Sequence, residues 1–165
     1  MTRLVIRKAR EPEYAEIKRL YDDHLPGGWW KSKEAFNRRM LANPPAATFV
    51  AIKEGKIIGA ISGKPQNFED LGQTFYVTGL ATDRTEPRLG KLLGTRIVAH
   101  AHDYGYRLAT LHGSDEIRDR LYEIFGAKRI GPNDSMHVIE TARAIELQRK
   151  EIIKELRKLT QQPSE

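Results

Sequence analysis

The segment over residues 74–104 constrains the fold most, because a strand-like run, a turn with two glycines and a helix-like run follow one another in it. Residues 74–82 are rich in β-branched and aromatic residues, which favour strands. Gly90 and Gly94 lie in the turn that opens the helical run. Such a turn directs free backbone N–H groups and the positive end of the helix dipole to one point, which suits a phosphate or pyrophosphate. An ordinary strand-to-helix connection has the same pattern, so both interpretations stay open at this stage.

Apolar runs of two kinds alternate along the rest of the chain. Their periods predict strands over 3–8, 48–53, 56–62, 107–112, 128–130 and 136–139, and helices over 12–24, 33–42 and 115–125. Glu54-Gly55 predicts a tight hairpin between two of the strands, and residues 64–73 are polar and read as irregular. Strands that alternate with helices, together with hairpins, predict an α/β fold with a mixed sheet.

The composition fits one domain that needs neither disulfides nor thiolate metal sites. The chain has 165 residues and no cysteine, and a domain of this length buries roughly two thirds of the surface that its unfolded chain exposes. No apolar run approaches about 18 residues and no leader-like segment follows Met1, so we expect a protein with no membrane segment and a cytoplasmic location. The net charge of +6 favours an anionic partner, although the basic residues are dispersed along the chain.

The pattern changes near residue 141. We expect one domain over 1–141 and a C-terminal amphipathic helix and tail over 142–165. A narrow apolar seam runs along this helix, with Arg149 interrupting it: Ile145, Ile152, Leu156 and Leu159. A helix with so thin an apolar stripe is marginal alone. It must therefore dock on the domain or pair with a second copy in a homodimer.

Trp29 and Trp30 follow a Pro-Gly-Gly segment that ends the first predicted helix. Adjacent residues point in different directions on most backbones, so we expect one indole to pack inward and the other to face a substrate. A loop position favours such a contact, and a structural role for both indoles is the alternative.

Several stretches taken together resemble the GCN5-related N-acetyltransferase (GNAT) superfamily. Residues 6–21 are similar to that family's first strand and helix, and the turn around Gly90 falls where the family keeps its pyrophosphate loop. Leu121-Tyr122-Glu-Ile-Phe-Gly126-Ala127 is similar to the family's stretch of leucine, tyrosine, three residues, glycine and phenylalanine. The resemblance covers residues 3–140. It implies an α/β fold with a mixed, mostly antiparallel central sheet flanked by helices, to which the C-terminal helix is an addition.

The loop departs from the family pattern at two positions. Leu89 stands where the family has Arg or Gln, and Leu92 stands where it has glycine. Backbone amides survive both changes, but a Cβ at position 92 removes the close approach that glycine gives to a phosphate. Arg84, Arg88 and Lys91 are the residues able to replace the missing positive charge.

The resemblance implies an N-acetyltransferase that moves an acetyl group from acetyl-CoA to an amine acceptor by direct attack in a ternary complex. Tyr122 would protonate the leaving thiolate, because a phenol is protonated at neutral pH, and Asp83 would be the best-placed carboxylate for the amine proton. A core tyrosine and a turn aspartate are the alternative roles. The pyrophosphate is expected on the amides of residues 91–94, and no metal is implied. The implied cofactor site consists of Leu80, Ala81, Thr82, Arg88, Leu89, Gly90, Lys91, Leu92, Leu93, Gly94, Thr95 and Asp115.

The acceptor is expected to be a small molecule or a protein that contacts Trp29, Trp30 and Arg38. Two other functions stay open. A GNAT-fold protein that modifies or binds nucleic acid, without ordinary use of acetyl-CoA, would bind DNA or RNA with a steep salt dependence. A non-catalytic module that dimerises through the C-terminal helix is the second alternative.

Overall fold

The computed structural model of the protein describes residues 3–113, 115–129 and 136–161. The strands are β1 (Leu4–Lys8), β2 (Ala47–Lys53), β3 (Lys56–Phe68), β4 (Gly72–Thr82), β5 (Leu108–His112), β6 (Lys128–Arg129) and β7 (Met136–Glu140). The α-helices are α1 (Tyr14–His24), α2 (Lys33–Met40), α3 (Leu89–Asp103), α4 (Asp115–Phe125) and α5 (Thr141–Gln161), with short 3-10 helices at Glu11–Glu13 and Trp29–Lys31.

The strands form one seven-stranded sheet in the order β1-β2-β3-β4-β5-β7-β6. Every neighbouring pair is antiparallel except β4 and β5, which run parallel. The predicted mixed, mostly antiparallel sheet with an added C-terminal helix is therefore confirmed.

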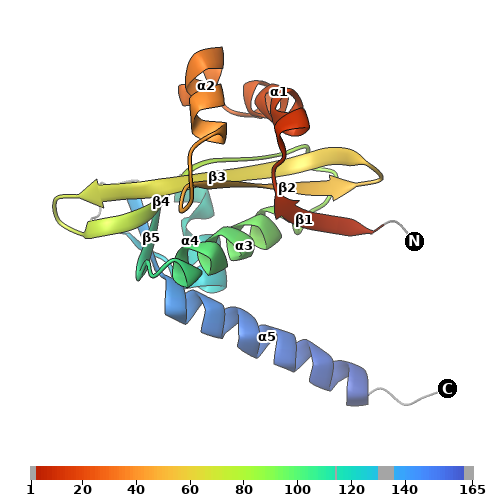
Figure 1. Cartoon of the computed structure of the whole chain (residues 1–165). Coiled ribbons are helices and arrows are strands. Elements are labelled where there is room, and N and C mark those ends of the chain that lie inside the picture. Colours follow the sequence, from red (N-terminus) through yellow and green to blue (C-terminus); the bar gives the residue numbers. More distant parts are fainter. Residues whose placement is uncertain (1–2, 114, 130–135, 162–165) are drawn as a thin grey trace.

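Helices cover both faces of this sheet. Figure 1 shows α1 and α2 on one face, α3 and α4 on the other, and α5 running past α3 and away from the body. Side chains alternate accordingly along β2: Val50 packs with α1 and α2, whereas Phe49 and Ala51 pack with α3. Both faces of the sheet are apolar at its centre, so helices pack against the same strands from both sides.

The connection between β2 and β3 is the tight hairpin that the sequence predicts. Glu54 and Gly55 have positive φ angles of 54° and 73°, as both central residues of a two-residue type I′ turn require. The turn sets Lys53 opposite Lys56, and the inward and outward alternation of both strands follows from that register.

β3 and β4 form a longer hairpin than the sequence predicts. Residues 64–73 look irregular because they contain Pro65 and Gly72, yet β3 continues to Phe68 and β4 begins at Gly72. The pairing of β2 with β3 extends only to Gly63, so beyond that residue β3 has a described strand neighbour on one side only. Proline is tolerated on such an edge because no ladder hydrogen bond is lost there.

α5 packs on the body with its first half. Ala144 is buried there, and Nε2 of Gln148 donates a hydrogen bond to the carbonyl of Ile124 at 2.7 Å. The side chains of the second half that are exposed and apolar are Ile152, Ile153 and Leu156, and the side chain of Leu159 lies outside the described residues. Although α5 is long, no helix in the described part of the chain combines the length and the apolar content of a membrane span.

Candidate functional site

The sheet separates into two halves, β1–β4 and β5–β7, because β4 and β5 pair over a short distance only. These strands pair only at Phe75–Ala109 and Tyr76–Thr110, whereas β4 remains paired with β3 as far as Thr82. Among the described residues, the backbone groups of residues 77–82 that point away from β3 therefore have no strand partner. We call this segment the open edge of β4. A ligand that carries amide groups can bind along such an edge as an added strand would.

A β-bulge marks the start of the open edge. Ser62 pairs with Gly79 and Gly63 pairs with Val77, which leaves Thr78 as the extra residue on β4. Its carbonyl accepts a hydrogen bond from Nε1 of Trp29 at 3.3 Å. Its hydroxyl oxygen is buried without a hydrogen-bond partner in the described part of the chain. Bulges end regular pairing and redirect side chains, so this one leaves polar atoms where the strands separate.

α3 begins after the loop that follows β4, and two of its first amides are free. The N–H of Leu89 bonds to the carbonyl of Glu86, and the N–H of Leu92 bonds to the carbonyl of Arg88. Within the described residues this leaves the N–H groups of Gly90 and Lys91 without partners at the positive end of the helix. The expectation that the amides of residues 91–94 would all be available is corrected: from residue 92 onward the helix uses them.

Two basic residues, Arg88 and Lys91, belong to this end of α3. Arg88 is exposed, and the first turn of α3 contains no acidic residue. Nζ of Lys91 lies 3.2 Å from a carboxylate oxygen of Glu151 on α5. A Cβ on Gly90 would meet no atom within 4 Å, so a ligand can approach these amides closely. The side chain of Leu92 is 38% exposed beside them. This end of α3 fits a pyrophosphate.

Four of the other residues predicted for the cofactor site hold α3 in place. Leu89 and Leu93 are fully buried in the core of the sheet. A Cβ on Gly94 would lie 2.8 Å from Cζ of Phe125, so glycine at this position lets α4 pack against α3. The hydroxyl of Thr95 donates to a carbonyl one turn earlier at 2.8 Å. The side chains at these positions therefore serve the packing of the helix.

Leu80, Ala81 and Thr82 form the end of the open edge, and their side chains differ in exposure. Leu80 is 37% exposed, whereas Ala81 is buried in the core beneath α1. The hydroxyl of Thr82 accepts a hydrogen bond from the N–H of Arg84 at 3.3 Å. In this segment, the groups able to contact a ligand are therefore the backbone and the side chain of Leu80.

Asp83 organises the loop between β4 and α3. Its Oδ1 accepts hydrogen bonds from the N–H of Thr85 at 3.0 Å and from the hydroxyl of Thr85 at 2.6 Å. Burial acts to raise the pKa of the Asp83 carboxyl, but the two hydrogen bonds and the nearby side chains of Lys56 and His24 together hold that pKa below its ordinary value. The carboxylate is thus engaged in a turn and is a weaker proton acceptor than an ordinary aspartate.

Tyr122 lies on α4, one turn before Phe125, and its side chain is 57% exposed. Phe125 contacts α3 at Gly94, and residues three apart are neighbours on a helix. Tyr122 therefore lies toward the side of α4 that faces α3, with a phenol that a ligand can reach. Asp115 begins the same helix, but its side chain lies outside the described residues.

Trp29 and Trp30 have different surroundings. Trp30 is buried in the core with α1 and α2, which removes it from a surface contact with substrate. Trp29 is partly buried and stacks on Phe36 with ring centroids 5.8 Å apart. On α2, Arg38 is exposed, whereas the guanidinium of Arg39 lies over the Trp29 ring.

The structure thus singles out Arg39, whereas the substrate contact predicted from the sequence is Arg38. The helical period distinguishes the two arginines from the sequence alone. At 100° per residue, position 39 is about 60° from the buried Phe36 around the helix axis, and position 38 is about 160° away. Arg39 is therefore the arginine that turns toward the sheet.

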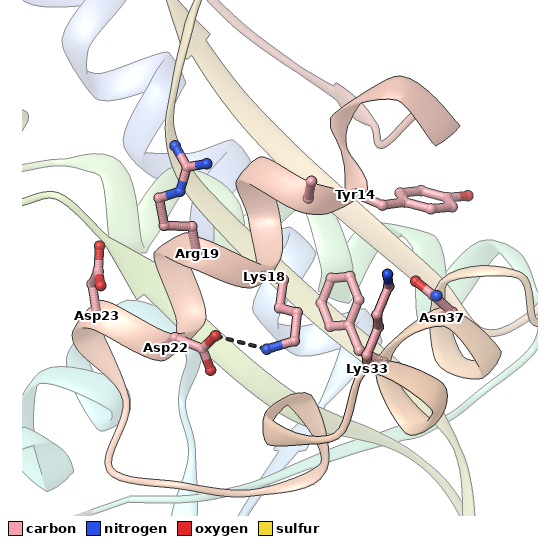
Figure 2. A pocket seen from close by; sticks show the side chains of 9 residues that line it. Tyr14, Lys18, Arg19, Asp22, Asp23, Lys33 and Asn37 are labelled. Atoms are coloured by element: carbon pink, nitrogen blue, oxygen red, sulfur yellow. Dashed lines mark hydrogen bonds and ion pairs between the residues drawn. The ribbon is translucent and has the colours of Figure 1, made fainter.

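A separate hollow of about 370 Å³ lies between α1 and α2. No residue of β4 or β5 lines it, and Figure 2 shows Lys18 and Asp22 on its wall, joined by an ion pair of 2.7 Å. Nζ of Lys31 lies 3.6 Å from the other carboxylate oxygen of Asp22. Its paired charges do not point to a ligand, so we place the site at the open edge of β4 and the start of α3.

Comparisons with known proteins bear on the fold and the family of this chain. A model of the acetyltransferase (GNAT) family matches residues 7–127. A sequence comparison with curated proteins finds no match. Among solved structures, a GNAT family acetyltransferase from Brucella melitensis in complex with acetyl-CoA superposes with a TM-score of 0.64 and 18% identity, covering 84% of this chain and 88% of that one.

Two further structures have the same fold. A GNAT family N-acetyltransferase from Escherichia coli in complex with CoA has a TM-score of 0.67 and 16% identity, covering 88% of this chain and 86% of that one. The Drosophila melanogaster polyamine N-acetyltransferase has a TM-score of 0.64 and 14% identity, covering 84% of this chain and 100% of that one. Likeness at this level of identity concerns the fold alone. The family model, which spans most of the chain, shows that this protein belongs to the acetyltransferase (GNAT) family.

Proposed function

We infer that the protein is an acyl-CoA-dependent N-acyltransferase that moves an acetyl group from acetyl-CoA to an amine acceptor. The observation that carries this inference is the open edge of β4, followed by the free amides of Gly90 and Lys91 at the start of α3. Acetyl-CoA has a pantetheine arm with two amide groups and a pyrophosphate, which match these two parts. Relatives of the same fold were solved with acetyl-CoA or CoA.

The cofactor would span both parts of the site. The amides of Gly90 and Lys91, with the charges of Arg88 and Lys91, would hold the pyrophosphate. The backbone of residues 77–82 would bind the pantetheine arm, and an N–H of this segment would polarise the thioester carbonyl. Arg84 is exposed in the loop between the two parts and adds positive charge.

The reaction forms an amide C–N bond and breaks the thioester C–S bond, so one proton must leave the amine and another must reach the thiolate. We assign the second transfer to the phenol of Tyr122, which is exposed on the side of α4 toward α3. Because Asp83 is held by Thr85, we assign removal of the amine proton to water. Direct attack in a ternary complex requires no covalent intermediate on the protein, and the chain contains no cysteine.

The acceptor site would lie on the face of the sheet opposite α3. Trp29, which donates a hydrogen bond to the bulge at Thr78, and Arg39, which lies over the Trp29 ring, would be among its side chains. The Drosophila relative forms N-acetylagmatine, and relatives in this fold differ in their acceptors, so the acceptor here follows from the residues of this chain.

The test is calorimetric titration of acetyl-CoA into the Gly90→Asp and Gly90→Asn variants and the wild type. The side chain at position 90 enters open space in both variants, and the two differ only in charge. Asp in the first turn of a helix stabilises it by about 0.3–1 kcal/mol, but it repels a pyrophosphate. We expect Gly90→Asp to bind at least about tenfold more weakly than Gly90→Asn, a difference of about 1.4 kcal/mol.

No binding of acetyl-CoA to the wild type would contradict the proposal. Equal affinities of the two variants would contradict the placement of the pyrophosphate. Binding of DNA with a steep salt dependence, in the absence of acetyl-CoA binding, would favour the nucleic-acid alternative.

A further inference from the structure

Three side chains from different elements meet on the face of the sheet that α1 and α2 cover. Lys64 of β3 and Tyr76 of β4 are directly opposite each other in the antiparallel register. Both lie close enough to Arg39 of α2 for its charge to shift their pKa values. We call these three residues the Arg39 cluster.

The two cations of the Arg39 cluster have no counter-charge in the part of the chain that the structure describes. Within the described residues, no carboxylate forms an ion pair with Arg39 or Lys64. Nη1 of Arg39 is buried and has no hydrogen-bond partner there. Burial lowers the pKa values of both residues, and the charge of Arg39 adds to the effect on Lys64. Arg39 and Lys64 are half-buried, and buried N–H groups such as Nη1 of Arg39 are normally paired, so this arrangement points to an anionic partner from outside the chain.

The Arg39 cluster lies beside the reaction site proposed above. Tyr76 is the last residue of β4 that pairs with β5, and the bulge at Thr78 lies two residues further along the strand. The Trp29 ring beneath Arg39 donates its Nε1–H to the carbonyl of Thr78. α3, with its free amides, lies on the opposite face of the sheet (Figure 1). A cofactor that enters from the α3 face and an acceptor that enters from the α1–α2 face would meet where the two strands part.

Aromatic rings border the same cluster. The Tyr76 ring has edge-to-face contacts with Phe68 and with His112, each with centroids 5.8 Å apart. The Trp29 ring borders Arg39 on another side. A bound group would therefore meet positive charge among partly buried aromatic rings, an environment that strengthens a charge–charge interaction over its value in water.

We propose that the acceptor amine carries an anionic group, a carboxylate or a phosphate, which binds to Arg39 and Lys64 while the amine attacks the acyl group. The proposal rests on the N-acyltransferase function inferred above and names its acceptor class. Two cations without a carboxylate also repel polyamines and other cationic acceptors.

The test uses acceptor pairs that differ in one anionic group: amino acids with their amides, and O-phosphoethanolamine with ethanolamine, with agmatine as a cationic amine. Release of CoA gives kcat/KM for each acceptor. We expect the anionic member of at least one pair to be favoured at least tenfold. Arg39→Gln should remove most of that preference, Arg39→Lys should retain part of it, and the matched control Arg38→Gln should leave it unchanged.

Binding of acetyl-CoA, measured by calorimetry in every variant, separates the two proposals. If acetyl-CoA does not bind the wild type, the N-acyltransferase function itself fails. If acetyl-CoA binds but neutral or cationic amines are preferred, or no anionic amine of the panel reacts, the acceptor proposal is overturned alone. The same holds if Arg38→Gln and Arg39→Gln lower the preference equally.

Discussion

The guanidinium of Arg39 lies 4.8 Å from the centroid of the Trp29 ring. The same indole stacks on Phe36 and donates a hydrogen bond to the carbonyl of Thr78. Trp29 therefore joins α2 to the bulge on β4. Its position decides where the charge of Arg39 lies relative to the open edge of β4.

This contact predicts a measurable coupling between the two residues. A cation over a partly buried indole contributes about 0.5–2 kcal/mol. In a double-mutant cycle with Arg39→Gln and Trp29→Leu, we expect a coupling of that size in the free energy of unfolding from urea titrations. The cycle that replaces Arg39→Gln by Arg38→Gln serves as the control, and its coupling should be near zero. Equal couplings in both cycles would show that the contact contributes nothing specific.

Removal of the Tyr122 hydroxyl should slow the chemical step. A positioned proton donor contributes about 10²–10⁴-fold to a rate, so we expect Tyr122→Phe to lower kcat by at least tenfold while the affinity for acetyl-CoA stays unchanged. Tyr104→Phe is the matched control, because Tyr104 is also exposed, at 47% compared with 57% for Tyr122. A kcat of wild-type size in Tyr122→Phe would exclude the phenol as proton donor.

The ion pair between Lys91 and Glu151 should weaken cofactor binding. Glu151 neutralises a cation at the start of α3, at a distance of 3.2 Å. Partly exposed ion pairs contribute about 0.2–1 kcal/mol, so Glu151→Gln should raise the affinity for acetyl-CoA by about two- to fivefold in calorimetry at low salt. Glu146→Gln removes a more exposed carboxylate of α5, which pairs with Lys150, and should leave the affinity unchanged. A lower affinity in Glu151→Gln would contradict this role.

His100 should make the protein less stable as the pH falls. Burial lowers the pKa of His100 below its ordinary value of 6.5, with Lys8 and Arg96 adding to the effect and the hydrogen bond to the carbonyl of Pro45 opposing it. Below a pH of about 6.5 the unfolded chain therefore binds a proton that the folded protein does not. The free energy of unfolding must decrease as the pH falls through this window.

Urea midpoints at pH 7.5 and 5.5 measure this decrease. We expect it to be smaller in His100→Gln than in the wild type. It should not be smaller in His24→Gln, because His24 is exposed and its positive charge beside Asp83 favours the folded protein. A His100→Gln variant with the same decrease as the wild type would assign the pH dependence to other groups.

The elements of the fold follow from periodic patterns, and most of them could be predicted. The exception is the 64–73 segment, where Pro65 looks like a strand breaker. Whether a proline disrupts a strand depends on whether a neighbour needs its N–H, and here β2 ends its pairing at Gly63. How far a neighbouring strand extends depends on tertiary structure, so it cannot be predicted from the local sequence.

The candidate site could be predicted only in outline. The glycine-containing turn indicates an anion site, but only the structure shows that Gly90 faces open space while Gly94 accommodates Phe125. The bulge at Thr78 depends on the register between β3 and β4. Arg39 could have been chosen over Arg38 from the helical period. The absence of a counter-charge near it, among the described residues, depends on which elements pack there.

The short pairing of β4 with β5 also bears on how the molecule holds together. Two residue pairs and the hydroxyl contact of Thr74 with Thr110, at 3.0 Å, join the halves of the sheet. A ligand bound along residues 77–82 would add contacts where the two halves of the sheet have separated. At a free ligand concentration of 100 times its dissociation constant, binding would add about 2.7 kcal/mol to the free energy of unfolding of the domain. The amides of β5 and β7, which pair with each other on the far side of this junction, would then exchange their hydrogens more slowly.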